Sequence, residues 1–406
     1  MDTRAPLTAE TQRQGGTNAL ASLGKIRSDL SRFLSRAEVG SQDFRLTPRA
    51  DPSPYARCFY VFLCHTLKLP FPLPSEELAM TIRVAVRAER QRCGDRTGDK
   101  PFRQLLTFSL SALALLDELR QDPLADLVKE QLARPVGLEL GSHGCLEGRA
   151  GSGNQAMFVG IFLIHARDYL GIDTHAAIEE WVRLHLAHMN RFGFWGETTA
   201  MTHLQFQNGY HQHELLEYLG VENPRREEAL VAVRRLADRE GHFAPYPGGG
   251  GCYDYDAVFM LTPEGRLQDI ATRSTLVKTA SSIASNQRDD GGFCESVYVR
   301  PRSIRNLCRF AAHAISAGRC MPLLAERLRY GITLQRNKHN SIHTHWSVYS
   351  RGWGESDLWD SWFRILALAR IDIALNPDHI DEWGFIDYPG IGYHPGLRNG
   401  FRRRLP

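Results

Sequence analysis

The stretch Asn286-Gln287-Arg288-Asp289-Asp290-Gly291-Gly292-Phe293 decides the fold, because shorter copies of it recur along the chain. Each copy is a glycine-containing turn that closes a helical pattern. The copies end at Phe194, Phe243 and Phe293, with spacings of 49 and 50 residues, and a weaker one ends at Leu146, 48 residues before Phe194. A repeat of this length holds two helices, and such a pair buries its apolar faces only against neighbouring pairs.

Apolar residues recur at steps of three and four along nearly the whole chain, and no β alternation competes with them. The candidate helices cover roughly 19–37, 54–67, 75–92, 101–119, 123–133, 154–171, 174–190, 203–219, 225–239, 252–261, 268–287, 302–316, 320–335 and 356–375. This pattern predicts an all-α chain in which the pairs close into a ring of inner and outer helices, an α/α toroid with about 48–50 residues per repeat. An open solenoid is the alternative.

The chain organisation and composition are those of a globular protein. We expect a flexible leader over 1–16 and a single toroid domain over 17–406, in which the less regular helical part 17–133 either completes the ring or packs outside it as a cap. Of the 406 residues 43% are hydrophobic and 23% charged, which excludes a disordered or fibrous chain. The net charge of +3 predicts neither nucleic-acid affinity nor binding to a membrane surface, although Arg402-Arg403-Arg404 is locally basic.

The cellular location follows from what the chain lacks. The N-terminus shows no apolar core of a signal peptide, and no apolar run reaches the roughly 18 residues of a transmembrane segment. The 8 cysteines include no CxxC pair and indicate reduced thiols. We therefore expect a soluble, cytoplasmic protein.

The turn at 286–293 resembles the Gln…Asp-Gly-Gly-Phe turns of the terpenoid cyclase and protein prenyltransferase superfamily, in squalene-cyclase-like repeats. One full match and several degenerate ones cover roughly 130–370. The resemblance implies an α/α toroid and a terpene-cyclase-like enzyme, an isomerase or lyase of isoprenoid biosynthesis.

The most informative stretch for chemistry is Gly248-Gly249-Gly250-Gly251-Cys252-Tyr253-Asp254-Tyr255-Asp256, where a glycine run opens a helix. Four glycines let a ligand approach the backbone closely. Asp254 and Asp256 are similar to a shortened form of the Asp-x-Asp-Asp-Thr-Ala motif whose middle aspartate protonates an alkene in class II terpenoid cyclases. The second adjacent carboxylate and the threonine are missing here. An acid of this kind must be buried or lie beside a like charge to stay protonated.

Other polar groups gather at the predicted starts of the inner helices, which a ring would bring to one mouth of a central cavity. They include Asn154, Asp360, and the cluster Asn208, Tyr210, His211, His213 and Glu214. Helix capping explains some of them. We predict catalytic roles for Asp254, Asp256, Asp360 and His211, with Asn154, Asn208 and Tyr210 among the substrate-binding residues. Arg364, four residues after Asp360, is placed to pair with it.

Aromatic and basic residues complete the predicted site. Tyr253, Tyr255, Phe259, Trp346 and Trp359 could line the cavity and stabilise a carbocation through their ring faces. Arg302, Arg305 and Arg309 follow at i, i+3 and i+7, a spacing that suits a diphosphate or, alternatively, a solvated outer face.

Metal chemistry has two candidate forms. A diphosphate head would bring Mg²⁺. Cys252 and Asp254 with His343 or His345 form a reversed version of the Asp-x-Cys zinc set of prenyltransferases. Asp289 and Asp290 belong to the repeat turn and lack the third carboxylate of a magnesium motif.

The sequence therefore predicts acid-initiated cyclisation of a small apolar or diphosphate-bearing isoprenoid in a central aromatic-lined cavity. A carbohydrate-active toroid is the alternative, with Asn208, Tyr210, His211 and His345 in a lyase, or Asp256 and Asp360 in a glycosidase. A non-catalytic binding toroid is the third reading. The oligomeric state is not predicted.

Overall fold

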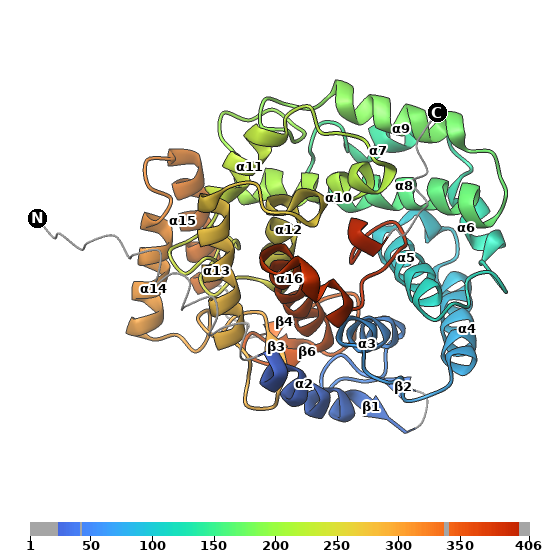
Figure 1. The fold of residues 1–406 in the computed structure, drawn as a ribbon, viewed down its shortest axis with the longest axis horizontal. Helices are drawn as coiled ribbons and strands as arrows, with labels where there is room; N and C mark the ends of the chain where they lie inside the picture. Colours follow the sequence, from blue (N-terminus) through green and yellow to red (C-terminus); the bar gives the residue numbers. More distant parts are fainter. Residues whose placement is uncertain (1–22, 41–42, 337–340, 398–406) are drawn as a thin grey trace, which may run out of the picture.

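Six helices form a closed ring in the computed structural model, which describes residues 23–40, 43–336 and 341–397 (Figure 1). Each of these helices packs against the next, and the last packs back against the first. They are α3 (Pro54–Leu67), α5 (Lys100–Leu115), α8 (Ser152–Tyr169), α10 (His203–Leu219), α12 (Gly251–Leu261) and α16 (Leu358–Leu375). Almost every residue of α16 is buried, as expected for a helix that is covered on all sides. The fold is an α/α toroid, as predicted.

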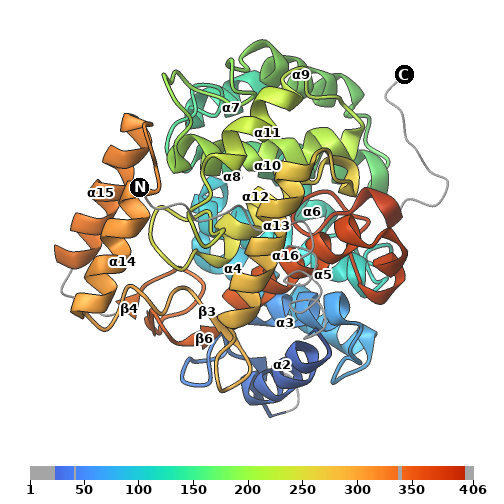
Figure 2. The ribbon, with the colours of Figure 1, turned by 60° about the vertical axis from the view of Figure 1, so that its left-hand side comes forward.

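A second layer of helices covers the outside of the ring (Figures 1 and 2). The helix α4 packs on α3 and α5, α6, α7 and α9 pack on α8, α11 packs on α12, and α13 packs on α12 and α16. Their bounds are α4 Ser75–Cys93, α6 Ala125–Gln131, α7 Val136–His143, α9 His175–Ala187, α11 Arg226–Arg234 and α13 Ile270–Ser285. Helix α2 (Leu23–Ala37) precedes the ring, and α14 (Ile304–Ile315) and α15 (Met321–Arg336) form a hairpin outside it.

Short irregular elements connect the helices. Three antiparallel pairs of two-residue strands join β1 (Glu38–Val39) to β2 (Asp43–Phe44), β3 (Phe293–Cys294) to β6 (Ser356–Asp357), and β4 (Ser341–Ile342) to β5 (Arg351–Gly352). The short 3₁₀-helices are η1 (Arg96–Gly98), η2 (Pro263–Gly265), η3 (Pro377–Glu382) and η4 (Pro395–Leu397). The strands hold loops in place and leave the all-α class unchanged.

The repeated turns share one backbone conformation. Gly193, Gly241 and Gly291 have φ angles of +76°, +90° and +94°, which only glycine adopts without strain. In the turn at 286–293 the Gln287 amide donates to the Gly291 carbonyl at 2.8 Å, and Phe293 at its end is fully buried. The glycines therefore mark the register of the repeat.

The chain after α16 returns across the ends of the inner helices and closes that end of the ring. The Gly384 amide donates to the Thr66 carbonyl on α3 at 3.0 Å, and the Tyr388 hydroxyl lies 3.0 Å from His165 on α8. Further along, the Gly392 amide donates to the Tyr255 hydroxyl on α12 at 3.2 Å. We call residues 383–393 the plug. It was missed in the sequence because it carries no helical period.

Two further expectations concern the ends and the membrane. The predicted leader over 1–16 lies outside the described residues. Among the described helices, none combines the length and apolar character that crossing a bilayer requires.

Candidate active site

The glycine loop at 248–251 is shaped by the chain's own carboxylates. Gly248 and Gly249 have φ angles of +87° and +66°. A Cβ on Gly249 would lie 2.6 Å from an Asp254 oxygen, and one on Gly251 would lie 2.8 Å from an Asp360 oxygen. Both positions thus need glycine, because a carboxylate occupies the space of the missing side chain.

Asp254 is an anchoring residue in this geometry. Its carboxylate accepts from the Phe243 amide and from His242 Nδ1, each at 2.9 Å, and from the Arg364 guanidinium on α16. Arg364 also donates to the carbonyls of Gly248 at 3.1 Å and Gly249 at 3.3 Å. Arg364 and Asp254 are both fully buried. The predicted pair between Arg364 and Asp360 is wrong, because α12 supplies the closer carboxylate.

Asp256, two residues further along α12, has a different environment. It is 2% exposed, and its Oδ1 has no hydrogen-bond partner among the described residues. Burial raises the pKa of Asp256 well above its ordinary value, and the charges of Glu214 and Asp254 raise it further. Burial without a counter-ion favours the protonated form of a carboxyl group. The sequence prediction that Asp256 has the setting of an acid is consistent with this geometry.

Glu214 on α10 is the residue that sequence reasoning left without a role. It is fully buried, and burial raises the pKa of Glu214 to about 8. The Tyr255 hydroxyl donates to Glu214 Oε1 at 3.5 Å. Burial raises the pKa of Tyr210 well above its ordinary value, and the nearby carboxyl groups of Glu214 and Asp256 raise it further. The carboxyl groups of Glu214 and Asp256 and the phenols of Tyr210 and Tyr255 therefore lie together, contributed by α10 and α12. We call these four residues the acidic cluster. The one sequence signal that pointed to Glu214 was the presence of polar residues around most of the circumference of α10.

Asp360 belongs to a second charged group at the start of α16. Arg351 on β5 pairs with Asp360 and with Glu295, each at 3.1 Å, and also with Asp357. Burial and the Asp360 charge raise the pKa of Glu295 to about 7, and burial raises that of Asp357. One arginine thus serves three carboxyl groups, and neither Arg351 nor Glu295 was predicted from the sequence.

His211 and Asn154 form a polar chain with Lys100 at the starts of α5, α8 and α10. Lys100 donates to Asn154 Oδ1 at 2.8 Å, so the amide nitrogen faces His211 Nε2 at 2.9 Å and donates to it. The proton of His211 is then on Nδ1, which is buried and has no partner among the described residues. Burial lowers the pKa of His211 to about 3, so the imidazole is neutral near pH 7.

Other predicted binding residues have structural partners. Asn208 accepts from the Gly151 amide at 2.7 Å and donates to the Gly148 carbonyl at 3.2 Å, which holds the loop before α8. Tyr253 is buried and its ring meets that of Tyr246 edge-on. Arg302 and Arg305 are exposed at the start of α14, outside the ring, and the structure does not bring them to the acidic cluster.

The aromatic residues do gather on the inner helices. Tyr210 meets Tyr255 and Phe259 edge-on, with ring centroids 6.2 and 5.8 Å apart. Trp359 on α16 lies 4.2 Å from Trp346 and 4.4 Å from Phe363. This apolar wall borders the acidic cluster, because Tyr255 and Phe363 are also in contact, at 5.5 Å.

The zinc set is not assembled. His343 contacts Ser350, and His345 Nε2 donates to Gln104 Oε1 at 2.7 Å. Within the described ranges the residues grouped closely enough to hold a metal are Asp372, His379 and Glu382. The Asp372 carboxylate already accepts from Trp383 Nε1 at 2.9 Å and Asn376 Nδ2 at 3.0 Å, so that group is explained by structural hydrogen bonds.

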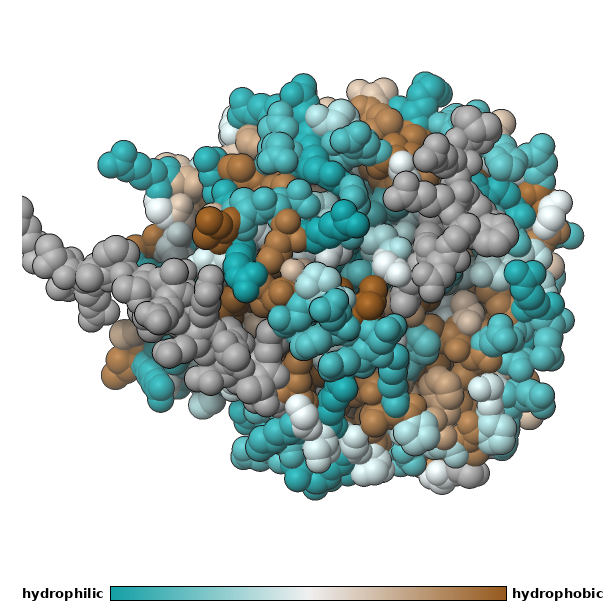
Figure 3. Space-filling view, viewed as in Figure 1, coloured by the Kyte–Doolittle hydropathy of each residue, from teal (hydrophilic) through white to brown (hydrophobic). Residues whose placement is uncertain are grey.

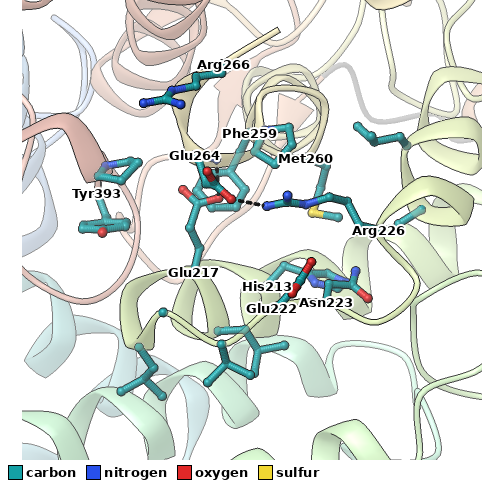
Figure 4. A pocket seen from close by; sticks show the side chains of 18 of the residues that line it. His213, Glu217, Glu222, Asn223, Arg226, Phe259, Met260, Glu264, Arg266 and Tyr393 are labelled. Atoms are coloured by element: carbon teal, nitrogen blue, oxygen red, sulfur yellow. Dashed lines mark hydrogen bonds and ion pairs between the residues drawn. The ribbon is translucent and has the colours of Figure 1, made fainter. Parts of the chain in front are cut away.

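A pocket with a volume of about 850 Å³ lies at the carboxyl ends of α10 and α12. Phe259, Met260 and Tyr393 line it, and the ion pair between Arg226 and Glu264 crosses its edge (Figure 4). The predicted cavity mouth, at the amino ends of the inner helices, is therefore not where this pocket lies. The pocket approaches the acidic cluster through Phe259, whose ring packs against that of Tyr210.

Comparison with known proteins gives only a distant likeness. No protein-family model matches the chain, and no curated protein matches it. A search of solved structures gives matches of low identity that span most of this chain. A variant of the enzyme MstE from Scytonema, in complex with its substrate geranylgeranyl dihydroxybenzoate, matches with a TM-score of 0.49 and 12% identity, over 89% of this chain and 99% of that one.

Two further structures give similar values. MstE from Scytonema without ligand has a TM-score of 0.46 and 15% identity, over 88% of this chain and 98% of that chain. A protein from Actinoplanes has a TM-score of 0.46 and 14% identity, over 86% and 99%. The fold assignment rests on the closed ring of helices itself.

Proposed function

We propose that this protein is a terpenoid-cyclase-like enzyme that starts the cyclisation of an isoprenoid or a similar polyene by donating a proton from Asp256. The observation that carries the proposal is the Asp256 carboxyl, which is buried, unpaired at Oδ1 and raised in pKa by its surroundings. An alkene is a weak base, so its protonation needs an acid that stays protonated in a water-poor site.

The proton balance is simple. The Asp256 proton adds to a terminal alkene carbon, the π electrons form the new C–H bond, and a tertiary carbocation and the Asp256 carboxylate remain. Successive alkenes attack the cation and close the rings, until loss of a proton ends the reaction. Glu214 and Tyr210, beside Asp256, are placed to return a proton to it.

The surrounding groups fit the demands of a carbocation. The faces of Tyr210, Tyr255 and Phe259 offer π electrons without a nucleophilic atom. The plug is hydrogen-bonded across one end of the ring, where we expect it to limit the access of water. Asp254 acts as a positioning residue in this proposal, since its ion pair with Arg364 holds the first turn of α12 against α16.

The head group of the substrate is left open by the proposal. Arg302 and Arg305 are outside the ring and do not support a diphosphate anchor there. Acid initiation needs no metal, and Mg²⁺ would enter only with a diphosphate head. Substrates with diphosphate and alcohol heads should therefore both be tried.

The test is incubation of the purified protein with geranyl, farnesyl and geranylgeranyl diphosphates and alcohols, with EDTA and then with Mg²⁺, followed by mass spectrometry. We expect a cyclised product that retains its head group without metal. Asp256→Asn should abolish it, whereas Glu222→Gln, an exposed carboxyl at the rim of the pocket, should not. Metal-dependent loss of diphosphate would contradict the acid role.

The carbohydrate alternative is an outcome of the same test. Its lyase set is weakened by the structure, because Asn208 and His345 have structural partners. Failure of all isoprenoids, with turnover of a uronate-containing oligosaccharide, would replace the proposal. A binding toroid would show retained ligand binding and no turnover in either assay.

A further inference from the structure

The hairpin of α14 and α15 stands at one side of the ring (Figures 1 and 2). Each of its helices has an apolar stripe that is exposed to solvent. The stripes have the same spacing of i, i+4, i+7 and i+11. They consist of Ile304, Cys308, Ala311 and Ile315 on α14, and Met321, Ala325, Leu328 and Ile332 on α15, all exposed. With Leu307, the six large residues keep between 48% and 83% of their surface exposed. Figure 3 shows apolar side chains at the left-hand edge, where the hairpin lies.

The opposite side of the hairpin is fixed to the ring by specific contacts. The buried Arg327 donates to the Leu236 carbonyl, outside the hairpin, at 2.7 Å. It also donates to the His313 carbonyl of α14 at 3.0 Å, which joins the two helices of the hairpin. Glu326 accepts from His203 Nδ1 at 2.7 Å and from its amide at 2.8 Å. These contacts define the face by which the hairpin packs on the rest of the protein, and the exposed stripes do not belong to that face. An exposed apolar surface of this kind on a folded protein marks an interaction site.

The hairpin is strongly basic. Residues 300–336 contain eight arginines and one acidic residue, Glu326, a net charge of +7. Glu326 is engaged with His203 and Arg309 with Glu240, so these two charges are used within the protein. Five arginines are exposed around the stripes: Arg302, Arg305, Arg319, Arg329 and Arg336. The rest of the chain must then be negative, since the total is only +3.

We propose that this hairpin docks on the surface of an anionic lipid bilayer. The apolar stripes would enter the boundary between head groups and acyl chains, and the exposed arginines would contact lipid phosphates and carboxylates. A lipid surface fits better than a protein partner, because the stripes hold only aliphatic and sulfur-containing side chains and lack the aromatic anchors typical of protein interfaces. With 12 and 16 residues, α14 and α15 are too short to span a membrane.

This inference is independent of the proposed function, since it uses no residue of the acidic cluster. It gives a role to the arginine stripe that the sequence singled out and the ring interior does not use. An apolar substrate dissolved in the bilayer would be close to a protein held this way.

The test is co-sedimentation of the full chain with vesicles of phosphatidylcholine containing about 30% phosphatidylserine, against vesicles of phosphatidylcholine alone. We expect binding to the mixed vesicles, at least about tenfold weaker binding to the neutral ones, and loss at high salt. The variant Ile304→Ser/Ile315→Ser and the variant Arg305→Glu/Arg329→Glu should each weaken binding by about tenfold or more.

A matched control is available. Ile270→Ser/Val348→Ser changes two residues that are 83% and 87% exposed outside the hairpin, and it should bind like the unaltered chain. Circular dichroism verifies that each variant is folded. The absence of binding to mixed vesicles would overturn the proposal, as would equal binding by hairpin and control variants. A doubling of mass in light scattering that Ile304→Ser/Ile315→Ser abolishes, without vesicle binding, would assign the face to a second copy of the chain.

Discussion

Arg364 on α16 and Asp254 on α12 form a fully buried ion pair, although they lie 110 residues apart in the sequence. The same guanidinium holds the carbonyls of Gly248, Gly249 and Glu295. This contact fixes the turn that presents Asp256 to the ring interior. It joins the last inner helix to the one before it, so it also supports closure of the ring.

Removal of the Arg364 cation should therefore destabilise the protein strongly. Arg364→Met leaves the Asp254 charge buried without a counter-ion, which lowers the free energy of unfolding by about 3–5 kcal/mol. Urea denaturation measures the change. The control Arg234→Met breaks a partly exposed pair with Asp269 and should lower it by less than about 1 kcal/mol. Equal losses in the two variants would show that the buried pair contributes no more than a surface one.

The two aspartates of α12 should respond in opposite ways to the same substitution. Asp254→Asn removes the partner of Arg364 and should lower the melting temperature. Asp256→Asn replaces a buried carboxyl whose Oδ1 has no hydrogen-bond partner among the described residues, and it should leave the melting temperature unchanged or raise it, while it abolishes turnover. Differential scanning calorimetry and product assays together distinguish these roles. A large loss of stability in Asp256→Asn would mean that its carboxyl has a structural partner.

The raised pKa of Glu214, about 8, makes stability depend on pH. Between pH 4.5, the ordinary value, and pH 8, the folded protein keeps a proton on Glu214 that the unfolded chain has released. The free energy of unfolding therefore falls as pH rises through this window, by about 1 kcal/mol per unit from this group. Glu214→Gln should flatten the decline by that amount in denaturation at several pH values, and the exposed Glu222→Gln should not. An unchanged slope in Glu214→Gln would contradict the assigned environment.

The glycine loop offers a test with a closely matched control. Gly249 and Gly171 have φ angles of +66° and +64°, so alanine at either site has a backbone strain of about 1–2 kcal/mol. At Gly171 no atom lies within 4 Å of the added Cβ, whereas at Gly249 it meets Asp254 and His242. Gly249→Ala should therefore lower both stability and turnover well beyond Gly171→Ala. Similar values for the two variants would mean that the loop has room for a side chain.

The sequence predicted the fold well because the apolar residues of each helix recur with a local period of three to four residues. The helices expected at 54–67 and 203–219 have those bounds in the structure, and the one expected at 252–261 begins one residue earlier. The short helix α7 was missed, as was the plug, which depends on contacts with α3, α8 and α12 that no local pattern reveals.

The site was harder to predict, because its partners are distant in the sequence. Asp254 and Asp256 were recognised by their helix and their neighbours, but their spacing could not show that Arg364 would pair with the first and Glu214 approach the second. Arg351 comes from a two-residue strand without a sequence signal. The sequence left two interpretations of the stripe at Arg302 and Arg305, an anion site or a solvated outer face, and the exposure of both side chains agrees with the second.

The measurement that tests the central claim most directly is turnover in D₂O without metal, using the isoprenoid that the first assay identifies. Asp256 exchanges its carboxyl proton with the solvent, so the product should contain one deuterium on the carbon that was protonated and should retain its head group. Asp256→Asn should give no product. A cyclised product without deuterium, or one that forms equally in Asp256→Asn, would contradict protonation by Asp256 as the first step.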